Sequence, residues 1–67
     1  MDELNEAVVL GDMLTDEGFM SGLTSRERDI VEMRCSGISL PDVAVAVGLP
    51  VSAVEYKIKE LVKRYIG

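Results

Sequence analysis

Residues 39–65 read SLPDVAVAVGLPVSAVEYKIKELVKRY, and the expected fold follows from the helix signals in this segment. The pattern Ser-x-x-Asp at 39–42 is typical of a helix start. Pro41 fits the first turn of that helix, where a missing N–H does no harm. Gly48 is the expected left-handed stop, and Gly48-Leu49-Pro50 forms a turn. The stretch therefore predicts a short helix over 40–47, a tight turn, and a longer helix over 51–65.

The longer helix has two distinct faces. Its apolar residues recur at helical spacing and predict a buried face, which consists of Val54, Ile58, Leu61, Val62 and Tyr65. The opposite face is polar and consists of Ser52, Glu55, Tyr56, Lys59 and Lys63. Two helices joined by a glycine-containing turn, the second with a polar outer stripe, predict a helix-turn-helix. In that motif the second helix enters the major groove of DNA.

The preceding residues predict another helix of the same core. Thr24-Ser-Arg-Glu27 is a capping box, in which the threonine hydroxyl and the glutamate carboxylate bond to each other's backbone N–H groups. The helix is expected over 24–35, with Gly37 as its stop. Cys35 is expected to be a small buried apolar residue.

The N-terminal part predicts one further helix. Residues 3–14, ELNEAVVLGDML, have apolar residues at helical spacing, and the apolar stripe is wider than one face. Residues 15–22 contain Gly18 and Gly22 and are interpreted as a connector. The fold class is thus all-α, with an extra N-terminal helix and connector (1–22) before a helix-turn-helix domain (23–67).

Composition limits the possible functions. The chain has 67 residues, one cysteine and no histidine, so no internal disulfide forms and no zinc site is recognisable. No Gly-rich phosphate loop or nucleophile–base pair is present, and we expect neither an enzyme nor a cofactor. No apolar run reaches the roughly 18 residues of a membrane span. The acidic start Met1-Asp2-Glu3 is unlike a signal peptide, which favours a cytoplasmic location.

Charge is distributed unevenly. The net charge is −5, but residues 1–22 hold six acidic and no basic residues, whereas residues 23–67 hold seven basic and six acidic ones. The chain is therefore an acidic arm on a near-neutral domain, and its total charge alone does not exclude nucleic acid.

From Leu23 onward the chain resembles the LuxR/GerE-type DNA-binding domain, whose pattern is roughly LTxRExxVLxLxAxGxSxxEIAxxLGISxxTVxxHxxxIxxKLG. The match runs without a gap over residues 23–66 and covers Leu23, Thr24, Arg26, Glu27, Gly37, Ser39, Ala44, Gly48 and Val54. Gly67 follows one residue after the position of the pattern's closing glycine. Region 4 of bacterial sigma factors is the near relative. The resemblance implies that Glu55, Tyr56 and Lys59 face DNA bases and that Ser52, Lys57 and Lys63 contact phosphates.

Several departures from the family pattern weaken the DNA-facing surface. Pro50 replaces the serine that would cap the last helix, Ala53 replaces a phosphate-binding threonine, and Glu55 places a carboxylate where lysine is frequent. The family's fourth helix, a common dimer contact, has no counterpart before the sequence ends. The helix at 3–14 is expected either to fold onto the core in its place or to pair with another chain, through Leu4, Val8, Leu10 and Leu14.

Two functions follow as expectations. The first is a small bacterial or phage-encoded transcription regulator that binds DNA through helix 51–65 as a homodimer. The second is a protein-binding antagonist that keeps the fold but binds a transcription regulator or an RNA polymerase subunit. The second is favoured by the net negative charge and by three departures from the family pattern, namely Ala53, Glu55 and the Leu40-Pro41 pair, which stands where the family has polar or basic residues.

Overall fold

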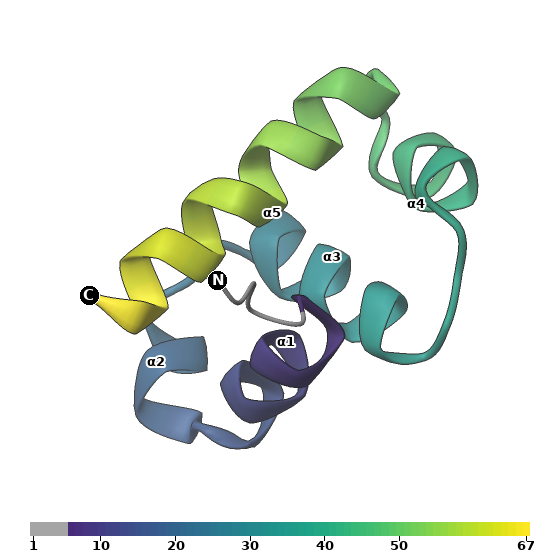
Figure 1. Ribbon diagram of the computed structural model, residues 1–67. Helices are drawn as coiled ribbons and strands as arrows, with labels where there is room; N and C mark the ends of the chain where they lie inside the picture. The colour runs from purple at the N-terminus through teal and green to yellow at the C-terminus, as the bar shows by residue number, and fades with distance from the viewer. Residues whose placement is uncertain (1–5) are drawn as a thin grey trace.

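The computed structural model describes residues 6–67, and this part of the chain is all-helical (Figure 1). Its helices are α1 (Glu6–Thr15), α2 (Glu17–Ser21), α3 (Ser25–Cys35), α4 (Leu40–Val47) and α5 (Val51–Ile66). The predicted all-α class is confirmed. The observed ends of α3, α4 and α5 lie within one residue of the predicted ones.

The N-terminal arm contains one helix more than predicted. Residues 17–21 were expected in a connector, yet they form α2, because Asp16 caps it by accepting a hydrogen bond from the Phe19 N–H at 3.1 Å. The short helix therefore starts at a side-chain cap, and neither Gly18 within it nor Gly22 at its C-cap prevents it. The first three residues of the predicted helix 3–14 lie outside the described residues.

Capping explains where α3 begins and ends. The Thr24 N–H donates to Glu27 Oε1 at 3.0 Å and the Glu27 N–H donates to Thr24 Oγ1 at 3.1 Å, so the predicted capping box is confirmed. At the other end Gly37 has a φ of +87°. The N–H groups of Gly37 and Ile38 donate to the carbonyls of Arg34 and Met33, which satisfies the last turn.

The starts of α4 and α5 lack side-chain caps. Ser39 is the N-cap residue of α4, as the pattern at 39–42 predicts, but its hydroxyl makes no capping hydrogen bond. The pattern therefore predicts the start of α4 correctly, although the capping contact itself is not formed. Pro50 precedes α5 and, as predicted, supplies no acceptor. Between the helices Gly48 has a φ of +74°, the left-handed conformation expected of it.

The core joins α1 to the C-terminal helices. Val9, Leu10 and Met13 of α1 are buried, and α1 packs against α3 and α5. Of the two alternatives for the N-terminal helix, the structure therefore shows the first, in which it folds onto the core of its own chain. The largest fully buried side chains are Met13, Ile30, Val31, Val43, Val54, Ile58 and Leu61.

Three further side chains lie at the edge of the core or outside it. The Phe19 ring of α2 meets the Tyr65 ring of α5 edge-on, with centroids 4.9 Å apart. Cys35 is exposed, and the expectation that it is buried was wrong. It is the last residue of α3, beyond the part of that helix that contributes buried residues.

Candidate nucleic-acid interface

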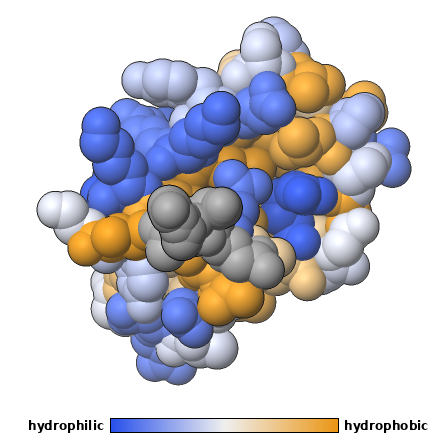
Figure 2. Space-filling view, in the orientation of Figure 1, coloured by the Kyte–Doolittle hydropathy of each residue, from blue (hydrophilic) through white to orange (hydrophobic). Residues whose placement is uncertain are grey.

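The outer stripe of α5 is free of the core. The five polar-face residues predicted from the sequence are all exposed, namely Ser52, Glu55, Tyr56, Lys59 and Lys63. Val54, Ile58 and Leu61 are buried on the opposite side, whereas Val62 and Tyr65 are only partly buried. In Figure 2 hydrophilic surface follows α5, with apolar surface near both of its ends. The predicted division of this helix into two faces is therefore confirmed.

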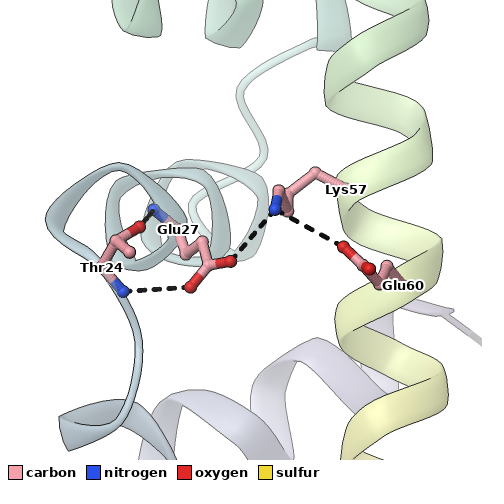
Figure 3. A network of polar contacts seen from close by, with 4 residues as sticks. All are labelled: Thr24, Glu27, Lys57 and Glu60. Carbon is pink, nitrogen blue, oxygen red and sulfur yellow. Dashed lines mark hydrogen bonds and ion pairs between the residues drawn. The ribbon is translucent and has the colours of Figure 1, made fainter.

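Lys57 lies beside this stripe and is held by two carboxylates (Figure 3). Its Nζ donates to Glu27 Oε2 of α3 at 3.2 Å and to Glu60 Oε1 at 3.4 Å. The same Glu27 carboxylate accepts the Thr24 N–H through its other oxygen. One buried glutamate thus closes the N-terminus of α3 and ties it to α5.

Both members of the Glu27–Lys57 pair are stabilised in their charged forms. The Thr24 N–H, followed by Lys57, lowers the pKa of Glu27, against the opposing effect of burial. The hydrogen bond to Glu27 is the main cause that raises the pKa of Lys57. At neutral pH this ion pair is therefore fully charged, and the positive charge of Lys57 is largely neutralised.

Three hollows in the described part of the chain border the stripe, and one of them, of about 400 Å³, lies at the C-terminal end of α5, where it is lined by Lys59, Lys63 and Ile66 among others. The remaining two adjoin each other. One, of about 380 Å³, lies along the outer side of α5 and is lined by Tyr56, Lys59, Glu60 and Lys63. The other, of about 640 Å³, lies between the start of α3 and the first half of α5. Tyr56 is 68% exposed and belongs to the walls of both. The two hollows therefore meet at this side chain.

The residues expected to contact a partner chain separate into three groups. Val8 and Leu14 are exposed, at 59% and 37%. Leu10 is 2% exposed and belongs to the buried core, so it is not available to a partner chain in this structure. Leu4 lies outside the described residues.

The structure also presents surface features that the sequence interpretation missed. Val45 of α4 is 82% exposed, which the apolar run at 43–47 did not indicate. Arg26, noted only as a family match, lines the hollow between α3 and α5. The helical position of Arg26, one residue before the buried Glu27, is the signal that places it at the edge of that contact.

Comparison with known proteins adds no relative. No family model matches the chain, and neither the curated proteins nor the solved structures include a significant match. Within residues 6–67, no helix has the length and apolar character needed to cross a bilayer, and no group of three or more carboxylate or cysteine ligands is placed to hold a metal ion.

Proposed function

We propose that this chain is a small transcription regulator that binds duplex DNA through α5, as the second helix of a LuxR-type helix-turn-helix. The observation that carries the proposal is the exposed outer stripe of α5. Helix α5, which carries this stripe, follows the short helix α4 and a turn in which Gly48 is left-handed, and α4 packs against α5. This order of elements is the one in which the second helix docks into the major groove.

Within this proposal the stripe divides into two kinds of contact. Lys59 and Tyr56 face base edges, where an ammonium can bind guanine and a ring can contact a thymine methyl. Ser52 and Lys63 contact the backbone. No described residue forms an ion pair with Lys59 or Lys63, so both ammonium groups are available. Lys57, the third phosphate candidate, would have to leave Glu27 and Glu60 and is the weakest of the set.

Glu55 opposes binding. It is exposed in the first half of α5, where it accepts from a cytosine amino group if the site offers one and otherwise repels phosphates. The proposed regulator therefore has modest nonspecific affinity and depends on sequence-specific contacts.

Dimerisation belongs to the same proposal. Because Val9, Leu10 and Met13 are used inside the chain, a homodimer would pair α1 through Val8 and Leu14. Two-fold symmetry would match half-sites about one helical turn apart.

The test is a fluorescence-anisotropy titration of labelled random and genomic duplexes, from 25 to 200 mM salt, with the oligomeric state measured by sedimentation. Binding in the micromolar range that weakens steeply with salt is expected. Lys59→Ala should weaken this binding, whereas Arg28→Ala, which removes the same charge from an exposed position of α3, should have little effect. Absence of binding at 25 mM salt would refute the proposal.

A second candidate is the protein-binding antagonist, and α4 favours it. Pro41, Val45 and Ala46 are exposed on this helix, and α4 contains Asp42 but no basic residue. In a DNA-binding helix-turn-helix the first helix crosses the phosphate backbone, for which this surface is poorly suited. Here Val45→Ser should abolish capture of a regulator or RNA polymerase subunit, while Lys59→Ala should not.

A further inference from the structure

The hollow between α3 and α5 has a net positive lining. Besides Lys57, it is lined by the exposed Arg26 and Ser25 at the start of α3, and by Tyr56 of α5. Its carboxylate is that of Glu27, whose two oxygens are occupied by the Thr24 N–H and by Lys57. Glu27 and Lys57 therefore neutralise each other, and the charge left to the hollow is that of Arg26.

Arg26 is free to bind an anion. No described residue forms an ion pair with it, and it is exposed. A guanidinium binds phosphate oxygens through a planar pair of N–H groups, whereas an ammonium is a single point of charge. Ser25 of α3 and Tyr56 of α5 add hydroxyl donors to the lining of the hollow.

The position of the hollow relative to the outer stripe suggests which anion this is. Tyr56 is shared by both hollows, with Lys59 and Lys63 on one side of it and Arg26 on the other. A ligand lying across Tyr56 would meet cationic groups on both sides. The two phosphate backbones that border the major groove of DNA have this arrangement, about 12 Å apart.

We propose that the hollow between α3 and α5 binds a backbone phosphate of duplex DNA through Arg26, on the side of Tyr56 opposite Lys59 and Lys63. The inference rests on the proposed function and extends it. The duplex lies across α5 between two cationic walls, and Lys57 serves to hold α3 in place. Because Arg26 comes from α3, the interface extends beyond the two helices of the motif.

The experiment measures the salt dependence of binding to a 20-base-pair random duplex for Arg26→Ala, Arg26→Lys and the matched control Arg28→Ala. Arg28 is also exposed on α3 but lies about 160° around the helix from Arg26 and does not line the hollow. One phosphate contact contributes about 0.9 to the slope of log K against log salt. Arg26→Ala should therefore weaken binding about 15-fold at 50 mM salt and about 4-fold at 200 mM, if the contact contributes nothing at 1 M.

Arg26→Lys should retain the slope, and Arg28→Ala should leave slope and affinity close to those of the unmodified chain. Far-UV circular dichroism verifies that each variant is folded. Equal effects of Arg26→Ala and Arg28→Ala would overturn the inference and leave DNA binding through α5 standing. If the unmodified chain does not bind the duplex at 25 mM salt, the proposed function and this inference both fail.

Discussion

Replacing Glu27 by alanine tests whether one side chain both caps α3 and fixes α5. The substitution removes the acceptor of the Thr24 N–H, a bond that contributes about 1 kcal/mol net. It also removes the ion pair with Lys57, whose side chains are 10% and 32% exposed for Glu27 and Lys57 respectively. For this partly buried pair we estimate about 1 kcal/mol, at the upper end of the range for exposed pairs.

The free energy of unfolding should therefore fall by about 2 kcal/mol. In a domain of this size that corresponds to a decrease in Tm of about 8–16 °C. Urea unfolding followed by far-UV circular dichroism measures it, since the chain has no tryptophan.

Glu60→Ala is the matched control, because it removes the other carboxylate bound to Lys57. That side chain is 40% exposed and sits three residues away on the same helix, so its loss should cost only about 0.3–0.5 kcal/mol. Glu27→Gln keeps an acceptor for Thr24 and should lie between the two. If Glu60→Ala destabilises the chain as much as Glu27→Ala, the dual role assigned to Glu27 is incorrect.

Three further outcomes are expected. Because the pKa of Glu27 is lower in the folded chain than in the unfolded one, the contribution of its carboxylate to stability is present at neutral pH and is lost as the pH falls through the folded pKa. Between pH 7 and pH 3, the urea midpoint of Glu27→Gln should therefore fall less steeply than that of the unmodified chain. Gly48 has a φ of +74°, so Gly48→Ala should destabilise the chain by about 1–2 kcal/mol. Gly11 lies within helix α1, where an added Cβ would meet no atom within 4 Å, so Gly11→Ala should stabilise the chain by up to about 1 kcal/mol. Thermal melts of the two variants should therefore shift in opposite directions. Thr24→Ala should cost about 1 kcal/mol but Ser39→Ala much less, because only Thr24 makes a capping bond, and equal losses in urea unfolding would contradict this reading.

The sequence predicted the C-terminal helices well because their ends depend on local chemistry. Thr24, Gly37 and Gly48 act on their own neighbouring backbone, and the apolar spacing of α5 follows from one helical period. Ser39 shows the limit of such patterns, since its hydroxyl fits a capping signature and yet makes no capping bond.

Tertiary features could not be read from these patterns. The pairing of Glu27 with Lys57 joins residues 30 positions apart, and Glu27 was interpreted as a capping residue alone. Likewise, the width of the apolar stripe on α1 was compatible with a partner chain or with the chain's own core. Only the burial of Leu10 and Met13, in a helix that packs against α3 and α5, distinguishes the two alternatives. The polar face of α5 predicted from the sequence is exposed, but Lys57, the remaining candidate for DNA contact, is only partly exposed and bound to Glu27 and Glu60. The hollow beside Arg26 required the relative placement of α3 and α5.

Met13 of α1 has no exposed surface, and its burial affects whether residues 23–67 can fold when they are moved to another protein without α1. Residues 23–67 contain α3, α4 and α5, the helices on which the proposed DNA binding depends, and are the obvious unit to graft onto another protein. Such a unit would leave a Met13-sized void and bare apolar walls on α3 and α5, and losing a methionine side chain from a core alone costs about 2–5 kcal/mol. A transplant therefore needs to carry α1 with it, or to supply an apolar helix of similar shape from its new host.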